Sequence, residues 1–352
     1  MIIDIVKVLL PSVTAFCIGI LITPAITNFL YTHKMWKKKA GKTALDGTEA
    51  TVFNGLHKDK EINTPRLGGT IIWISAGLTA LIAWTLSRTI SGDVLSKLDF
   101  VSRNQTWIPL FTLLTGAVIG LIDDLLEIRS GAGGLSLKKR LVLVGGIGLA
   151  CGVWFSYKLD IVSIGLPYGG EIFLGMLFPI FFALVTIFIY SGGVIDGIDG
   201  LAGGIFASMF TAYGGIAFYQ QQINLAAFCI TITGAILAFL WFNIPPARFY
   251  MSETGSMSLT ITLSVVAFMT DRLGGGYGIL VLPIIALPLV VTTLSNLIQI
   301  SSKKFRGKKV FLVAPIHHHF EAIGWPQYKI TMRFWIVSIV CAMLGFALAL
   351  IG

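Results

Sequence analysis

The chain has 352 residues, of which 55% are hydrophobic and only 12% are charged, and its formal net charge is +9. Soluble domains usually carry about 25% charged residues, so this composition excludes a protein built around a soluble core. A mean hydropathy of +0.84 instead indicates a protein that crosses a membrane many times.

Ten stretches of the chain are apolar over the length, or nearly the length, of a membrane-spanning helix. They cover residues 8–30, 68–87, 107–122, 141–157, 172–190, 204–219, 224–242, 257–270, 277–300 and 333–351. We predict an all-α polytopic membrane protein with about ten transmembrane helices, in a single domain over 1–352. The cysteines lie inside these runs without a CxxC pair, which indicates neither zinc nor disulfides.

The basic residues lie mostly on alternate connections between the runs. If the N-terminus is outside, the odd-numbered connections, together with Arg333 at the edge of the ninth, hold 20 of the 26 Lys and Arg residues. The positive-inside rule then places these connections in the cytoplasm. Topology therefore explains the basic excess, and we expect no nucleic-acid partner. Some lysines of the first connection, 31–67, can still contact lipid head groups or a phosphorylated substrate.

Asp123 and Asp124 end the third run on the predicted cytoplasmic side. Adjacent side chains on a helix point about 100° apart. One carboxylate can therefore face a metal ion while the other orients it or takes a proton. The alternative is a solvated helix end, which is weakened because negative charge at a helix C-terminus opposes the helix dipole.

Asp196 and Asp199 follow the fifth run within a glycine-rich stretch, 192–204. Each carboxylate would cost roughly 2.5–3.5 kcal/mol at the centre of a bilayer, so the pair needs a partner or a water-filled site. The glycines leave room for a ligand or another helix. The alternative is a polar connection in which Gly193 and Gly197 make a close helix contact.

The seventh and ninth connections carry further polar groups. Tyr250 lies between Asn243 and Glu253 and can stack on a nucleobase, although aromatic residues also anchor membrane interfaces. The three consecutive histidines at 317–319 can ligate a metal or donate hydrogen bonds to phosphate oxygens. Consecutive spacing suits metal ligation on a helix poorly, so we favour donation to a diphosphate.

These acids and histidines all fall on predicted cytoplasmic connections or helix ends. Mg²⁺ typically binds through one or two carboxylates plus the phosphates of a substrate. A membrane protein with such a site is suited to moving a phosphoryl group from a soluble nucleotide to a lipid.

The chain resembles the phospho-N-acetylmuramoyl-pentapeptide transferase family over most of its length. The motifs that carry the resemblance are Asp123-Asp124, the segment from Asp196 to Ala202, Trp241-Phe242-Asn243, Thr254-Gly255-Ser256, the segment from Ala314 to Glu321, Gly324-Trp325-Pro326 and Arg333-Phe334-Trp335. The resemblance implies ten spans with an outward N-terminus, Mg²⁺, a homodimer and a bacterial plasma-membrane location. It also implies transfer from UDP-MurNAc-pentapeptide to undecaprenyl phosphate, with release of UMP.

The resemblance further implies the roles of individual residues. The catalytic residues would be Asp123, Asp124, Asp196, His317, His318 and His319. The substrate-binding residues would be Lys60, Asp199, Gly200, Asn243, Tyr250 and Gln299. Glu253 and Asp124 would hold Mg²⁺, and Asp123 would deprotonate or orient the lipid phosphate.

Three features depart from the usual pattern of the family. Glu253 stands where the family usually has Asp, and its longer arm can still reach a metal. Tyr190 and Gly193 replace two usual asparagines. The segment Thr64–Gly69, which contains Arg66, is more similar to that of sister enzymes that transfer GlcNAc-1-phosphate than to the usual segment of the family.

Two other functions stay open at this point. One is the same chemistry with UDP-GlcNAc as the donor. The other is a membrane transporter, which would place its acids near the bilayer midplane on discontinuous helices, often with repeat symmetry. The acids of this chain lie instead at one predicted face.

Overall fold

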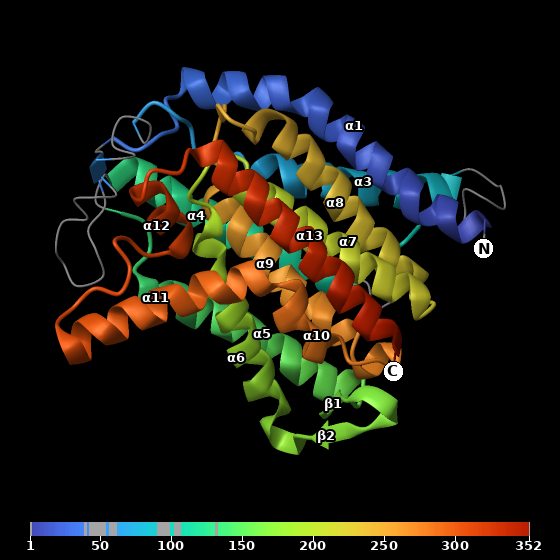
Figure 1. Ribbon diagram of the computed structural model, residues 1–352. Helices are drawn as coiled ribbons and strands as arrows, with labels where there is room; N and C mark the ends of the chain where they lie inside the picture. The colour runs from blue at the N-terminus through green and yellow to red at the C-terminus, as the bar shows by residue number, and fades with distance from the viewer. Residues whose placement is uncertain are drawn as a thin grey trace.

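The computed structural model describes residues 2–38, 41, 54–55, 62–89, 99–101, 107–130 and 133–351. Over these ranges the chain is almost entirely helical, which confirms the predicted fold class (Figure 1). The main helices are α1 (Ile2–Thr32), α3 (Thr70–Thr89), α4 (Trp107–Ser130), α5 (Leu137–Lys158), α6 (Phe178–Gly192), α7 (Leu201–Tyr219), α8 (Ile223–Asn243), α9 (Ser252–Met269), α10 (Gly278–Ile285), α11 (Leu287–Arg306), α12 (Ile316–Ala322) and α13 (Gln327–Ile351).

Within the described residues, eight helices are long and apolar enough to cross a membrane, or nine if the bent pair α10 and α11 is one span. The protein is therefore a multi-pass membrane protein. The predicted eighth span coincides with α9, which is not one of these helices. Apart from Glu253, every residue of α9 is buried within the protein. Hydroxyl groups such as those of Thr260 and Ser264 donate to carbonyls of the same helix, so these polar side chains have partners although they are buried.

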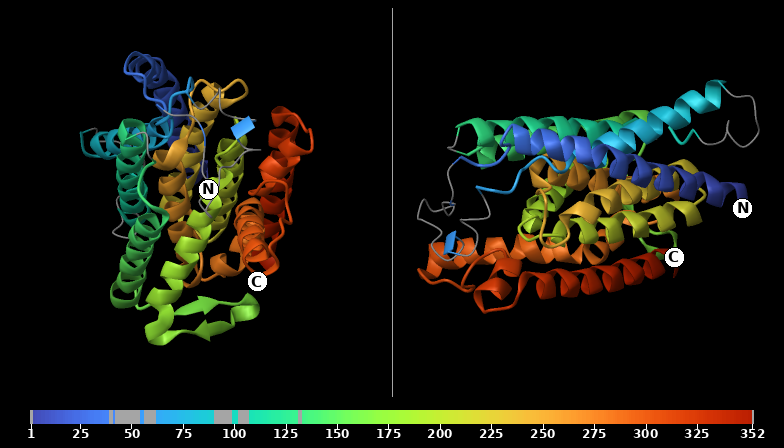
Figure 2. Two further views of the ribbon diagram at one scale, coloured as in Figure 1. Left: turned by 90° about the vertical axis from the view of Figure 1, so that its left-hand side faces the viewer. Right: turned by 90° about the horizontal axis from the view of Figure 1, so that it is seen from above.

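Helix α9 lies at the centre of the bundle and packs against α3, α4, α6 and α7. Around it, α8 packs between α1 and α7, and α13 packs on the other side of α7. Figures 1 and 2 show both termini at one end of the bundle and α12 at the other end. We call the end that carries α12 the α12 end.

Two predicted spans differ from the structure. Residues 277–300 do not form one straight helix, because α10 and α11 meet at an angle of 71°. Ala286 is non-helical (φ −95°, ψ 23°), and Pro288 in the first turn of α11 has no N–H with which to continue the pattern of α10. The helix in the predicted span 172–190 begins later than predicted, at Phe178. Residues at the predicted start belong to an antiparallel hairpin of β1 (Ser163–Gly165) and β2 (Glu171–Phe173).

The close packing of α4 on α9 positions the site. A Cβ atom at Gly120 of α4 would collide with the carbonyl oxygen of Glu253 in the first turn of α9. Glycine therefore lets the two backbones approach at this point. Asp123 and Asp124 follow Gly120 within one turn, so they lie beside the beginning of α9.

Candidate functional site

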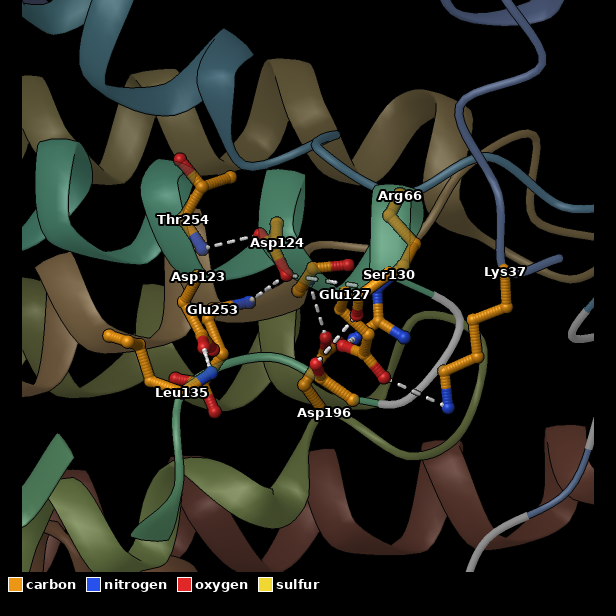
Figure 3. Close-up of polar contacts among 12 residues, drawn as sticks. Lys37, Arg66, Asp123, Asp124, Glu127, Ser130, Leu135, Asp196, Glu253 and Thr254 are labelled. Carbon is orange, nitrogen blue, oxygen red and sulfur yellow. Dashed lines mark hydrogen bonds and ion pairs between the residues drawn. The ribbon is translucent and has the colours of Figure 1, made fainter. Parts of the chain in front are cut away.

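The first turn of α9 brings two of the predicted carboxylates together (Figure 3). The N–H groups of a first helical turn have no partner within the helix and need other acceptors. Asp196 accepts the N–H of Ser252 at 2.8 Å, and Asp124 accepts those of Glu253 at 3.3 Å and Thr254 at 2.9 Å. Each negative charge at this end of the helix also interacts favourably with the helix dipole, by about 0.3–1 kcal/mol.

Arg140, at the beginning of α5, connects two further carboxylates. Its Nη2 lies 3.0 Å from Oδ2 of Asp123, and its Nη1 lies 2.6 Å from Oε1 of Glu253. Asp123 also accepts the backbone N–H of Leu135. The hydroxyl of Tyr190 donates to the other oxygen of Glu253, at 3.3 Å. Asp123 and Glu253 therefore face one shared cationic group.

Arg66 and Lys37 neutralise the next part of the cluster. Nη2 of Arg66 lies 3.0 Å from Glu127, and its Nε lies 3.7 Å from Asp124. Nζ of Lys37 lies 3.1 Å from the other oxygen of Glu127. Burial alone would lower the pKa of Arg66, but the nearby carboxylates, Glu127 first among them, outweigh it and raise the pKa above its ordinary value. Arg66 therefore stays charged.

Helix α12 places two of the histidines against the stretch that contains Asp196. A Cβ atom at Gly197 would lie 2.6 Å from Nε2 of His318 and 2.7 Å from Nε2 of His317, so this approach requires glycine. Nδ1 of His318 lies 2.6 Å from a carboxylate oxygen of Glu321. That contact fixes the imidazole ring with its Nε2 directed toward Gly197.

The residues predicted to bind a nucleotide join two loops at the same end of the bundle. Asn243 accepts the N–H of Gly200 at 3.0 Å and donates to the carbonyl of Phe249 at 2.8 Å. Asp199 accepts the N–H of Ala247 at 3.2 Å. These bonds hold the loop before α7 and the loop before α9 in one fixed surface.

The other predicted residues are placed as follows. Tyr250 is half-buried, and its backbone N–H donates to the carbonyl of Pro65 at 2.9 Å. Gln299 is buried, and its amide makes hydrogen bonds to the backbone of residues 310–311. Nδ1 of His319 accepts a backbone N–H from the segment before α12, at 3.3 Å. Lys60 lies outside the described residues.

A cavity of about 1590 Å³ opens beside the cluster. Its polar part is lined by Arg66, Glu127, Arg140, Tyr190, Asp196, Glu253 and His318. Its apolar part lies between α5 and α6 on one side and α10 and α11 on the other, and is lined by residues such as Leu141, Phe181, Leu184, Phe188, Leu282 and Leu297. Lys303, Lys304 and Lys309 also line it. Asp123 and Asp124 are fully buried and contact the cavity-lining Arg140 and Arg66.

The carboxylates fit a hard divalent cation, although the described residues contain no group of three His, Cys, Asp or Glu side chains already arranged around a metal position. Mg²⁺ does not need such a group, because it usually takes one or two carboxylates plus substrate phosphates. The guanidinium of Arg140 shows that Asp123 and Glu253 can share one cation. Asp124 lies next to them but already accepts two N–H groups of α9.

Known proteins are similar to this chain over nearly its whole length. Residues 106–271 match glycosyl transferase family 4. A phospho-N-acetylmuramoyl-pentapeptide-transferase of Chloroflexus aggregans is 32% identical over 99% of this chain and 91% of its own length. The chain belongs to this transferase family. Members from a Geobacillus species and from Clostridium perfringens are 33% and 31% identical, over 81% and 97% of this chain and 84% and 96% of their own lengths.

Within this member of the phospho-N-acetylmuramoyl-pentapeptide-transferase family, sequence reasoning missed the partners of the acids. These partners are Lys37, Arg66, Glu127, Arg140 and Tyr190. The basic residues were assigned to topology, and no spacing rule indicates which of them contact the carboxylates. The one signal in the sequence was that Arg66 and Tyr190 stand at positions where we expect this chain to depart from the family pattern.

Proposed function

We propose that the protein transfers phospho-MurNAc-pentapeptide from UDP-MurNAc-pentapeptide to undecaprenyl phosphate, giving lipid I and UMP for peptidoglycan synthesis. One observation carries the proposal: a cluster of carboxylates and arginines meets a large cavity that has an extended apolar part between α5–α6 and α10–α11. Such a cavity suits a ligand with an anionic head and a long hydrocarbon tail. The names of the relatives give the same reaction class.

The proposed orientation puts the α12 end at the cytoplasmic face of the bacterial plasma membrane and the N-terminus outside. The support is the positive-inside rule, because 20 of the 26 Lys and Arg residues lie on the connections assigned to that side or, as Arg333 does, directly beside one of them. A soluble nucleotide donor would then reach the site from the cytoplasm, and the lipid acceptor from the bilayer. We also propose a homodimer, on the family resemblance alone.

Mg²⁺ is part of the proposal. Glu253 and Asp124 would hold it, beside the position where Glu253 and Asp123 now share Arg140. When bound, the ion would neutralise charge on the transferring phosphoryl group and on the departing UMP. Arg140, released from the carboxylates, can donate to phosphate oxygens, for which a guanidinium is well suited.

In the proposed reaction, a phosphate oxygen of undecaprenyl phosphate forms a bond to the phosphorus that carries the sugar. The bond from that phosphorus to an oxygen of UMP breaks, and UMP leaves with that oxygen. Asp123 orients the lipid phosphate or takes its proton. His317 and His318 donate to the diphosphate, with the ring of His318 held by Glu321. The uridine would contact Asp199, Gly200, Asn243 and Tyr250.

The direct test is an assay of the purified protein with polyprenyl phosphate and either UDP-MurNAc-pentapeptide or UDP-GlcNAc, with Mg²⁺ or with EDTA. We expect UMP and a lipid-linked product with the first donor and Mg²⁺, and neither product with EDTA. A preference for UDP-GlcNAc would assign the protein to the sister reaction. Substrate flux across proteoliposomes without UMP would make it a transporter.

Two carboxylate variants test the site itself. Asp123→Asn and Asp124→Asn should each lower the rate of UMP release by at least about 100-fold. Asp160→Asn is the matched control, because Asp160 is exposed after α5, far from α12, and should keep the full rate. Full UMP release by both Asp123→Asn and Asp124→Asn would contradict the assignment.

A further inference from the structure

Two positions at which the chain departs from its family contact each other. Glu253 replaces the usual Asp, Tyr190 replaces a usual Asn, and the Tyr190 hydroxyl lies 3.3 Å from Oε2 of Glu253. A Glu side chain is one methylene longer than Asp and has one more rotatable bond. Its carboxylate therefore reaches further and needs an additional contact to be held in one position.

The aromatic ring of Tyr190 is fixed independently of its hydroxyl. Tyr190 lies in the last turn of α6, is only 6% exposed, and packs in a small apolar cluster with Val144 of α5 and with Met257 and Ile261 of α9. Three helices thus determine where the ring lies. The hydroxyl, at the edge of this cluster, reaches the polar part of the cavity.

The two oxygens of Glu253 have different partners. Oε2 accepts the Tyr190 hydroxyl, and Oε1 lies 2.6 Å from Arg140, whose other Nη contacts Asp123. A hydrogen bond to one oxygen fixes the rotation of a carboxylate about its last bond. The Tyr190 hydroxyl therefore determines how Oε1 is directed toward the cation position that Glu253 shares with Asp123.

We propose that Tyr190 is a positioning residue that orients Glu253 for binding a divalent cation. The inference rests on the proposed function insofar as Glu253 is a metal ligand. Partners in contact with metal ligands orient them and typically change metal affinity or activity by 10- to 100-fold when they are removed. Replacement of Tyr190 by Phe keeps the packed ring and removes only the hydroxyl, which donates to Glu253 and also faces Arg140.

The test compares Tyr190→Phe with Tyr213→Phe in the purified protein. Tyr213 is the matched control, because it is a buried tyrosine whose hydroxyl donates to the carbonyl of Gly278 at 2.9 Å, away from the site. We expect Tyr190→Phe to weaken Mn²⁺ binding, measured by electron paramagnetic resonance without any donor, by about 10-fold. The Mg²⁺ concentration for half-maximal UMP release should rise by a similar factor, while KM for the UDP donor changes less than about 2-fold. Tyr213→Phe should change none of the three.

A second background separates positioning from general packing. In Glu253→Asp the shorter carboxylate no longer reaches the hydroxyl, so adding Tyr190→Phe should change Mn²⁺ binding by less than about 2-fold. Unchanged Mn²⁺ binding in Tyr190→Phe, an equal loss in the Glu253→Asp background, or no Mn²⁺ binding by the unaltered protein would each overturn the inference. If the protein binds Mn²⁺ but releases no UMP from any donor, the proposed function fails, while the Mn²⁺ comparison still decides the role of Tyr190.

Discussion

At the scale of single residues, buried and half-buried carboxylates in this protein are stabilised by backbone N–H groups at both ends of the bundle. Asp124 and Asp196 accept N–H groups of the first turn of α9. At the opposite end, Asp271 accepts the N–H of Gly165 at 2.6 Å and that of Ile279 at 3.0 Å. The first pair fixes the start of a helix beside the site, whereas Asp271 ties the β-hairpin to the start of α10.

Asp271 leads to a prediction about pH. Burial raises its pKa from 3.8 to about 6, and the N–H groups of Ile279 and Gly165 offset only part of that effect. The folded protein then binds this proton more tightly than the unfolded chain does. Its contribution to the free energy of unfolding is therefore fully present below about pH 4 and is lost as the pH rises through about 6, up to roughly 3 kcal/mol.

We expect the thermal unfolding midpoint of the protein to fall between about pH 4 and pH 7, and Asp271→Asn to remove much of that fall. Scanning fluorimetry of both proteins over this range measures the difference, and other titrating groups cancel in the comparison. Parallel pH curves for the two proteins would show that Asp271 does not titrate in this way.

At the scale of elements, α9 is a polar helix at the centre of a membrane protein. Its Ser and Thr side chains are tolerated because neighbouring helices cover it on all sides. Its first turn is the point at which α4, the stretch before α7 and the connection after α8 meet through Asp124, Asp196 and Glu253. The position of α9 relative to α4 therefore determines the geometry of the site.

The substitution Gly120→Ala tests whether the position of α9 relative to α4 determines the geometry of the site. In Gly120→Ala the new methyl group would collide with the carbonyl of Glu253, so α4 and α9 must separate. We expect a loss of about 1–3 kcal/mol in the free energy of unfolding, and a lower rate of UMP release because Asp124 moves away from the N–H of Thr254. Denaturation in detergent and the UMP assay measure the two effects.

The matched control is Gly77→Ala in α3, where a Cβ atom meets nothing within 4 Å. Alanine there should leave activity unchanged and be neutral or stabilising by up to roughly 1 kcal/mol. If Gly77→Ala and Gly120→Ala behave alike, close packing at Gly120 does not determine the site.

At the scale of the whole molecule, the chain separates its two ends. Both termini and the β-hairpin lie at one end, and α12 and the basic C-terminal part of α11 lie at the other (Figure 1). The carboxylate cluster lies at the second end, because α12 contacts Gly197, next to Asp196. The proposed orientation assigns the second end to the cytoplasm, and labelling from one side of the membrane can test that assignment.

For this test, the four native cysteines are first replaced, and single cysteines are then introduced as Tyr168→Cys or Lys304→Cys. Tyr168 lies between β1 and β2 with 88% of its surface exposed, and Lys304 is exposed near the end of α11. A membrane-impermeant maleimide added to intact cells should label only Tyr168→Cys, and permeabilisation should add Lys304→Cys. The reverse pattern would contradict the orientation.

Local properties of the sequence predicted much of this protein. Apolar runs of spanning length can be located from the order of apolar residues along the sequence, and each of the ten predicted runs overlaps a helix. Asp196 was singled out because an acid beside a membrane span is costly without a partner, and Asp123, Asp124 and Glu253 because they lie at helix ends or connections on the same predicted side. The structure brings these four residues together at one end of the bundle.

Only the tertiary structure decided which groups meet those acids and where a span breaks. Arg140 contacts Glu253 across 113 residues of sequence, and no periodicity or hydropathy encodes that distance. The contact exists because α4, α5, α6 and α9 pack closely, which depends on the shapes of their facing surfaces. The turn at Ala286 and the bond from Tyr190 to Glu253 have the same origin. Sequence determined the membrane class and the acids of the site, whereas packing determined their partners and the direction in which each carboxylate points.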